Sequence, residues 1–200
     1  MTWRTHVAGG VASLWLLAPV LPVIGIPATG NPEAWSNTGL LAVLAGIGAL
    51  LPDLDAAESK AKHAWFQFQL GGERIRVAPL AFPALVLGTL LTHRGPLHSL
   101  LALGIAALVL GVPLALFASW PAALALLLGW ASHLVLDACT KSGVPLLWPD
   151  ERRIRLVPPF LRVTTGSDAE GLVFALCLVA AFGLLLSALP GLRAVNTPSW

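Results

Sequence analysis

The chain has 200 residues, of which 56% are hydrophobic and only 11% are Asp, Glu, Lys or Arg. Because soluble domains carry about 25% charged residues, this composition excludes an ordinary soluble protein and indicates one domain, residues 1–200, held largely in a lipid bilayer. The formal net charge is only +2, so we expect no nucleic-acid partner.

Six apolar segments follow one another along the chain, at residues 7–27, 38–51, 77–91, 97–120, 121–137 and 171–190. A membrane-spanning helix needs about 20 residues, and the apolar region of a signal peptide is shorter, so we expect 7–27 to be a retained first helix. The segment 38–51 is short, but its helix can begin near Pro32, because proline suits the first helical turn.

The distribution of basic residues predicts the orientation in the membrane. Segments 52–76 and 138–170 are rich in Lys and Arg, whereas 28–37 has none, so the first two are expected in the cytoplasm. This orientation requires 77–91, which is short and contains Pro79 and Pro83, to be a re-entrant or interfacial helix. We therefore predict an all-α, polytopic helical membrane bundle with about five transmembrane helices and one such short helix.

The basic segments are expected to form small cytoplasmic caps. "WFQFQLGGERIRV" alternates partly around Gly71-Gly72, which is typical of a β-hairpin, although residues 58–69 could equally form an amphipathic helix. "RRIRLVPPFLRV" has a similar pattern, but Pro158-Pro159 would confine any strand there to a sheet edge.

The predicted topology places most of the ionisable side chains at one end of the spans. They are His6, Asp53, Asp55, His93, His98, His133, Asp137 and Glu170. Ionisable groups at membrane depth are costly and usually pair with one another or line a functional cavity. Their convergence at one level predicts such a cavity at the cytoplasmic face.

His133 and Asp137 are four residues apart, so a helix presents both side chains on one face, where they could share a metal ion. The alternative is a helix-stabilising pair, which is disfavoured within an apolar helix by the cost of burial. Asp53 and Asp55 follow Pro52, and alternate side chains of an extended segment point the same way. They could bind one ion, bridge two, or simply end a solvated helix.

His93 and His98 are five residues apart, which one helix does not align. A turn through Gly95-Pro96 can bring them together, with His98 in the first turn of the next helix. Sets of imidazoles and carboxylates suit Zn, Mn or Fe. The neighbouring Arg94 could hold a phosphate or carboxylate through two hydrogen bonds, or contact lipid headgroups, and the sequence favours neither reading.

Glu170 ends the motif "SDAE", which fits a capping box in which Ser167 and Glu170 satisfy free backbone amides at a helix start. From the residues alone, a capping role is favoured over a catalytic one. His63 lies among Lys60, Lys62 and Trp65 and is expected at the surface.

The ordered set "THVAGG", "LLPDLDAAES", "HRGPLHSL", "GWASHLVLDACTKSGVPLLWP" and "TTGSDAE" resembles the YdjM-type family of membrane-bound, metal-dependent hydrolases of bacteria and archaea. The resemblance implies a cell-membrane protein with metal-site residues His6, Asp53, Asp55, His93, His98, His133 and Asp137. It also moves Glu170 from capping toward a ligand or supporting role. Family members often have a histidine where this chain has Ala56, so that position is empty or His63 supplies it.

We therefore predict a hydrolase that uses one or two divalent ions, with zinc preferred over manganese or iron. Its expected substrate is a phosphoester or ester of a lipid or other amphiphile at the cytoplasmic face of the bacterial or archaeal inner membrane. Asp55 or Glu170 would be the general base, and Arg94 would hold the substrate anion. The alternatives are a divalent-metal transporter, a metal-binding membrane protein without hydrolase activity, and a purely structural membrane protein.

Overall fold

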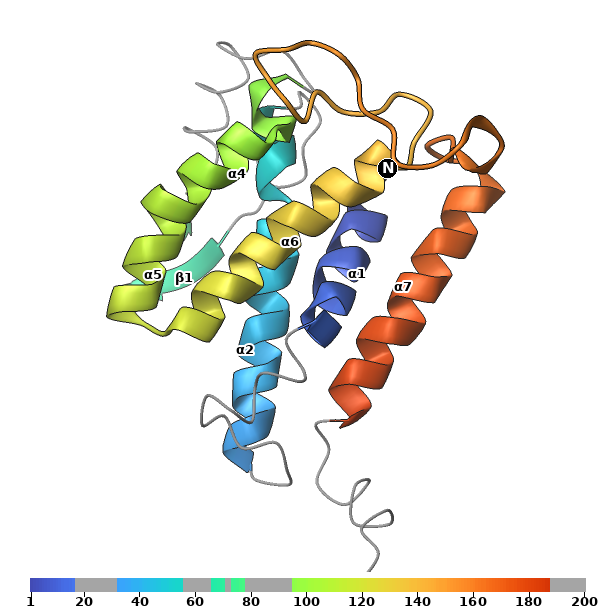
Figure 1. Ribbon diagram of the computed structural model, residues 1–200. Helices are drawn as coiled ribbons and strands as arrows, with labels where there is room; N and C mark the ends of the chain where they lie inside the picture. Colours follow the sequence, from blue (N-terminus) through green and yellow to red (C-terminus); the bar gives the residue numbers. More distant parts are fainter. Residues whose placement is uncertain (17–31, 56–65, 71–72, 78–94, 188–200) are drawn as a thin grey trace, which may run out of the picture.

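The computed structural model describes residues 1–16, 32–55, 66–70, 73–77 and 95–187. Its helices are α1 (Trp3–Ser13), α2 (Pro32–Gly48), α4 (Leu100–Ala106), α5 (Val112–Phe117), α6 (Trp120–Ala138) and α7 (Asp168–Ser187). A π-helical turn, Ala107–Gly111, joins α4 to α5, and the two form one continuous rod (Figure 1). This arrangement confirms the expected all-α membrane bundle.

Three of the described helical segments are long and apolar enough to cross a membrane: Leu100–Phe117, Trp120–Ala138 and Asp168–Leu186. They correspond to the predicted segments 97–120, 121–137 and 171–190. The shorter helix α2 begins at Pro32, as the proline predicted. The expected re-entrant segment 77–91, apart from Val77, lies outside the described residues, as does the expected first span beyond residue 16.

Helix α1 begins earlier than the sequence predicted. The expected first span started at residue 7, which left His6 in front of it, whereas His6 lies inside α1. The helix extends back to Trp3 because nothing in "WRTH" breaks it and Thr2, in extended conformation, occupies the N-cap position. His6 is thereby held on a rigid element.

The first basic cap is a β-hairpin. Strand β1 (Phe66–Leu70) pairs antiparallel with β2 (Glu73–Val77), Phe66 opposite Val77 and Leu70 opposite Glu73. The amphipathic-helix alternative is therefore wrong for residues 66–69. In the second basic segment the described residues form only single bridges, Thr140 with Val163 and Val144 with Ile154, and Pro159 begins a 3-10 turn instead of a strand.

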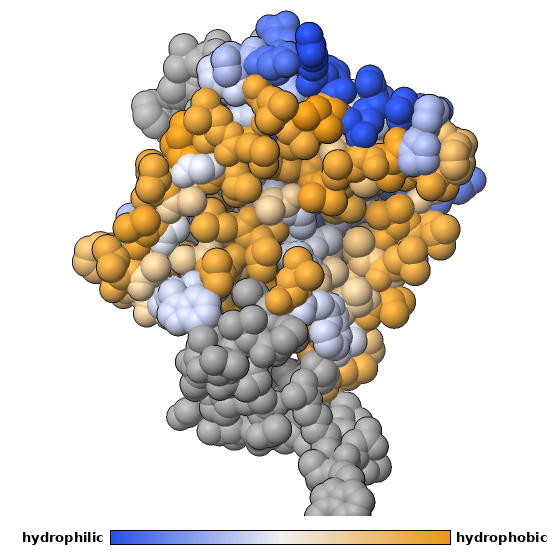
Figure 2. All heavy atoms as spheres, viewed as in Figure 1, coloured by the Kyte–Doolittle hydropathy of each residue, from blue (hydrophilic) through white to orange (hydrophobic). Residues whose placement is uncertain are grey.

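Helix α6 lies at the centre of the bundle, between α4–α5 on one side and α1 and α7 on the other, and it packs against α2 (Figure 1). Within the most apolar 18 residues of each candidate span, 61% are buried in α6, against 11% in α4–α5 and 17% in α7. Figure 2 shows an apolar body below a hydrophilic upper end. The outer helices therefore present an apolar surface suited to lipid, and α6 forms the interior of the bundle.

Two glycines allow α6 and α2 to touch backbone to backbone. A Cβ atom on Gly48 would lie 1.9 Å from the carbonyl oxygen of Leu126, and one on Gly129 would lie 2.0 Å from that of Ala45. Only a residue without Cβ fits at either position. This contact brings the end of α2 beside the last turns of α6, where the polar residues gather.

Candidate metal centre

Four separate elements deliver polar side chains to one end of the bundle. Helix α1 supplies His6, the 3-10 turn Leu51–Asp55 supplies Asp53, the 3-10 turn Pro96–His98 supplies His98, and α6 supplies His133 and Asp137. In Figure 1 the N-terminus, the start of α4 and the end of α6 lie at this same end. Segments up to 131 residues apart in the sequence thus meet, as the predicted topology required.

His98 and His133 form the middle of the cluster. Their Nε2 atoms are 3.2 Å apart. Asp53 Oδ1 lies 3.5 Å from His98 Nε2 and 3.6 Å from His133 Nε2. The contact between Asp53 and His98 therefore brings the turn that follows α2 beside the turn that precedes α4.

Asp137 and His6 complete the cluster. Asp137 Oδ1 lies 3.4 Å from His6 Nε2 and also contacts the Met1 nitrogen, and Oδ2 lies 3.9 Å from the Nε2 atoms of both His98 and His133. The His6 ring stacks on the His133 ring, with centroids 3.7 Å apart and planes at 16°. Both carboxylate oxygens of Asp137 therefore face imidazole nitrogens.

These atoms form two possible ligand sets, His6–Asp53–His133 and His98–His133–Asp137, in each of which the donor atoms lie within 4.8 Å of one another. With zinc bonds of about 2.0–2.1 Å, two ligands of a tetrahedral site lie about 3.3 Å apart. The observed spacings of 3.2 to 3.6 Å around His133, His98 and Asp53 are close to that value.

The chemistry of the donors also fits a divalent metal. The side chains of His6, His98, His133 and Asp137 are at most 1% exposed. Within the described part of the chain, His6 Nδ1 has no hydrogen-bond partner, and His6 Nε2 has the 3.4 Å contact with Asp137 Oδ1 but no well-formed hydrogen bond. A buried polar atom without a partner is destabilising, and a metal ion would satisfy it. Nitrogen and carboxylate ligands suit zinc, manganese and iron.

The hydrogen bond at His133 Nδ1 determines which ring nitrogen of His133 carries the proton. His133 Nδ1 lies 2.7 Å from the carbonyl oxygen of Ala49. A carbonyl only accepts hydrogen bonds, so Nδ1 carries the proton and the lone pair of Nε2 points into the cluster. The Ala49 carbonyl reaches His133 because Gly48 and Gly129 allow the close approach of α2 and α6. Such a contact orients a ligating histidine and raises its basicity.

Asp53 is the accessible member of the cluster, with a side chain that is 20% exposed. Burial acts to raise the pKa of Asp53, but the hydrogen bond with His98 and the nearby imidazoles outweigh it and lower the pKa to about 2. Asp53 is therefore an anion at neutral pH.

Glu170 holds two helix starts together. Its carboxylate accepts hydrogen bonds from the Thr5 hydroxyl at 2.9 Å, from the Gly166 N–H at 2.6 Å and from the Thr2 N–H. Glu170 thus satisfies a backbone amide at the helix start, as the capping interpretation predicted, whereas the Ser167 hydroxyl donates to the Thr164 carbonyl. Glu170 belongs to neither ligand set, but it fixes Thr5, the neighbour of His6.

The other predicted site residues lie at or beyond the edge of the described chain. His93, Arg94, His63 and Ala56 fall outside it, and Asp55 ends the turn Leu51–Asp55 with no side chain described. His98 precedes its helix, contrary to the expectation that it lies in the first turn. The Ser99 hydroxyl caps α4 by accepting from the Ala102 N–H at 3.1 Å, which ends the 3-10 turn at His98.

The sequence reasoning missed Ala49 and Thr5. Ala49 acts through its backbone carbonyl, for which no residue type is a signal, and Thr5 was inconspicuous beside His6 in "THVAGG". A buried threonine next to a ligand is a usable signal, since its hydroxyl needs a partner.

Known proteins resemble this chain over most of its length. Residues 1–192 match the family model of the YdjM inner membrane protein. "Uncharacterized protein YvsG" of Bacillus subtilis (strain 168) is 31% identical over 177 residues, which is 88% of each chain. "Inner membrane protein YdjM" of Escherichia coli (strain K12) is 42% identical over 80 residues, 39% of this chain and 40% of that protein. No solved structure matches.

Proposed function

This chain belongs to the YdjM family of inner membrane proteins, and we propose that it is a hydrolase that uses one or two divalent metal ions, zinc first among them. Its proposed substrate is a phosphoester or ester of a lipid or other amphiphile. One observation carries the proposal. Donor atoms of His6, His98, His133, Asp53 and Asp137 converge within ligand distance from four elements in a buried site.

A purely structural role accounts for the cluster less well. Polar residues that cap helices find partners in the backbone, as Ser99 and Glu170 do. His6 has no such partner within the described residues, although its ring is fully buried. Three buried imidazoles that point their Nε2 atoms toward two carboxylates are the composition expected of a divalent-metal site.

The protein's own groups have distinct roles in this proposal. His6, His98 and His133 supply nitrogen ligands and Asp53 and Asp137 supply oxygen ligands, and His133 is kept in the ligating tautomer by the Ala49 carbonyl. A divalent ion held there supplies Lewis acidity toward a phosphoryl or carbonyl oxygen. Asp55 remains our candidate for the general base and Arg94 for the group that holds the substrate anion.

The surrounding charges support a cytoplasmic site. Lys141, Arg152, Arg153, Arg155 and Arg162 all lie in the segment between α6 and α7, at the end of the bundle that holds the cluster. This end is the hydrophilic one in Figure 2. Basic segments stay on the cytoplasmic side, where they also attract anionic lipid headgroups. An amphiphile is then the substrate that reaches the site most directly.

The transport alternative needs a path to both membrane faces, with ligands near the midplane. Here the ligands lie at the ends of helices: Asp137 is next to the last residue of α6, and Asp53 follows α2. That position supports an enzyme that works at one face.

The test begins with the metal content of protein purified without chelators and measured by elemental mass spectrometry. We expect about one to two equivalents of zinc or manganese per chain. His98→Ala, and the double variant His133→Ala with Asp137→Ala, should lose them, while Ser132→Ala, one residue from His133, should keep them. Wild-type protein that stays free of metal after reloading contradicts the proposal.

Activity is then measured on phosphodiester, phosphomonoester and carboxylic-ester lipids in mixed micelles. Hydrolysis of one class that requires the metal and is lost in His98→Ala supports the enzyme. A fully loaded protein that hydrolyses none of them, but carries the metal into proteoliposomes, supports transport instead.

A further inference from the structure

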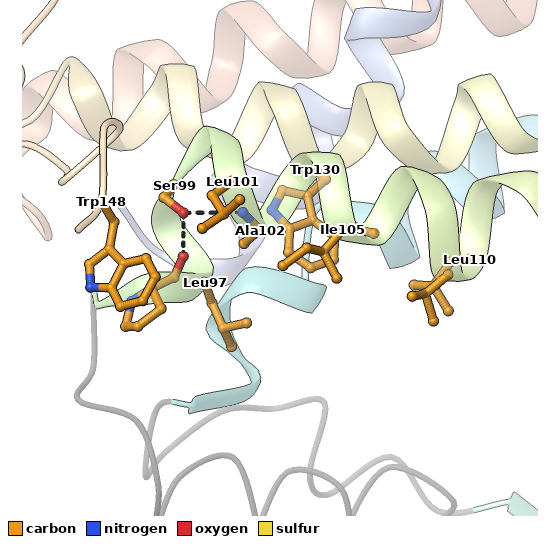
Figure 3. Close-up of a pocket in the computed structure, with 11 residues that line it drawn as sticks. Leu97, Ser99, Leu101, Ala102, Ile105, Leu110, Trp130 and Trp148 are labelled. Carbon is orange, nitrogen blue, oxygen red and sulfur yellow. Dashed lines mark hydrogen bonds between the residues drawn. The ribbon is translucent and has the colours of Figure 1, made fainter. Parts of the chain in front are cut away.

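A cavity of about 390 Å³ lies beside the proposed metal centre, between the α4–α5 rod, Trp130 of α6 and Trp148 (Figure 3). At one end it is bounded by Pro96, Leu97 and Ser99, which flank the ligand candidate His98. Its volume is typical of small-molecule sites, and its lining is almost wholly apolar. A site with this lining takes an aliphatic ligand.

We propose that this cavity binds one aliphatic chain of a membrane lipid, with the polar end of that lipid at the His98 corner. The chain-binding part of this proposal is independent of catalysis. Its second part, that the bound lipid is the substrate, rests on the proposed hydrolase function.

The length of the cavity fits one lipid leaflet. Its lining runs along the rod from Ser99 to Leu110. At 1.5 Å per residue this is a rise of roughly 16 Å. The hydrocarbon core of a bilayer is about 30 Å thick, so one leaflet is about 15 Å. A chain that starts at the His98 corner therefore ends near the bilayer midplane, beside Leu110.

The surroundings of the cavity identify its occupant. It opens along the α4–α5 rod, of which only 11% is buried, so it is continuous with the surface that contacts lipid. The π-helical turn Ala107–Gly111 contributes Val109 and Leu110 to the wall, and π turns interrupt helices frequently at functional sites. In a bilayer, the molecule that reaches such an opening is a lipid chain.

Trp130 is the residue of α6 in this apolar wall. Its side chain lines the cavity and is only 6% exposed, and its Nε1 atom has no hydrogen-bond partner among the described residues. In Figure 3 this nitrogen is on the side of the ring toward Ser99 and Ala102, the His98 end. Because this nitrogen is buried, Trp130 presents its apolar ring atoms to the cavity, which suits an aliphatic chain.

The test is photo-crosslinking in vesicles of phosphatidylethanolamine and phosphatidylglycerol that contain a phosphatidylethanolamine with a diazirine in one acyl chain. The adducts are mapped by peptide mass spectrometry. We expect them to concentrate on residues 97–110, at roughly tenfold more per exposed apolar residue than on α7. Adducts spread over α4–α5 and α7 in proportion to exposure overturn the proposal, because they indicate boundary lipid alone.

Two variants sharpen the result. Ala102→Phe fills the cavity beside Trp130 and should lower the adducts on residues 97–110 by roughly tenfold. Ala175→Phe places the same ring on the exposed face of α7 and should leave them unchanged. A folded, metal-loaded Ala102→Phe protein with undiminished labelling overturns the chain-binding site. Should Ala102→Phe fail to fold, the wild-type map decides by itself.

The same samples separate this proposal from the proposed function. Labelling of the cavity in protein that binds no metal supports the lipid site and contradicts the hydrolase. A metal-loaded protein with labelling proportional to exposure overturns the lipid site and leaves the hydrolase standing.

Discussion

Helices α6 and α7 have nearly the same length, 19 and 20 residues, and both contain a candidate membrane span. Their surroundings differ, however. The span in α6 has the lower hydropathy, 1.4 against 2.3, and it is 61% buried where that of α7 is 17% buried. The less apolar helix occupies the interior because its small residues pack closely and its polar side chains, His133 and Asp137, require protein partners, whereas α7 can face lipid directly. In this bundle, high hydropathy indicates contact with lipid rather than a place in the core.

The largest difference in stability is expected between alanine substitutions at two glycines, one in α6 and one in α7. Gly129→Ala in α6 places a methyl group 2.0 Å from the Ala45 carbonyl, so α6 must separate from α2. We expect a loss of about 4 kcal/mol or more, or no folded protein at all. Gly171→Ala in α7 meets nothing within 4 Å and should be neutral or stabilising by about 0.5–1 kcal/mol. Thermal unfolding in detergent measures both, and equal melting temperatures contradict the close helix contact.

Leucines give the next contrast. Leu134 of α6 is 2% exposed and Leu176 of α7 is 62% exposed. Leu134→Ala should cost about 2–5 kcal/mol through the cavity it leaves. Leu176→Ala exchanges one lipid-facing side chain for a smaller one and should cost less than about 0.5 kcal/mol. Denaturant unfolding in mixed micelles measures the free energy of unfolding of both variants. A larger loss for Leu176→Ala would contradict the interior position of α6 and the lipid-facing position of α7.

A comparison of two aspartates, Asp137 of α6 and Asp168 of α7, tests which residues bind the metal. Asp137→Asn removes an anionic ligand candidate that faces His6, His98 and His133. We expect the affinity for zinc to fall by about 100-fold or more. Asp168→Asn alters an exposed residue in the first turn of α7 and should leave the affinity unchanged. Competition with a chromophoric zinc chelator reports both affinities. Unaltered binding by Asp137→Asn removes this residue from the ligand set.

The smallest effect on stability and zinc affinity is expected at Glu170 of α7. This residue bonds to the start of α1, the helix that carries His6. Glu170→Gln weakens the hydrogen bonds from Thr2, Thr5 and Gly166 and should cost about 1–2 kcal/mol of stability. We expect zinc affinity to fall about tenfold, because His6 is held less firmly. Glu170→Asp should restore part of it. Complete loss of metal in Glu170→Gln, with stability intact, identifies Glu170 as a ligand instead.

Local sequence patterns were sufficient for the elements and for part of the site. The apolar runs predicted the three described spans, Gly71-Gly72 predicted the hairpin, and the i, i+4 spacing placed His133 and Asp137 on one helix face. These features depend on neighbours along the chain, namely hydropathy, turn residues and helical period, which a single sequence contains in full. His6 was identified by no spacing argument; the predicted topology placed it with the other ionisable residues, and the resemblance to the YdjM family supported its place.

Only the tertiary structure decided how these pieces meet. The stacking of His6 on His133, the carbonyl of Ala49 on His133 Nδ1 and the attachment of Glu170 to α1 all depend on how closely the helices approach. Between α2 and α6 that distance is set by the absence of a Cβ atom at Gly48 and Gly129. The sequence by itself determined which residues are costly to bury in a membrane. The packing of α6 against α1 and α2 determined which of them share a site, because contacts between distant segments follow from shape rather than from spacing.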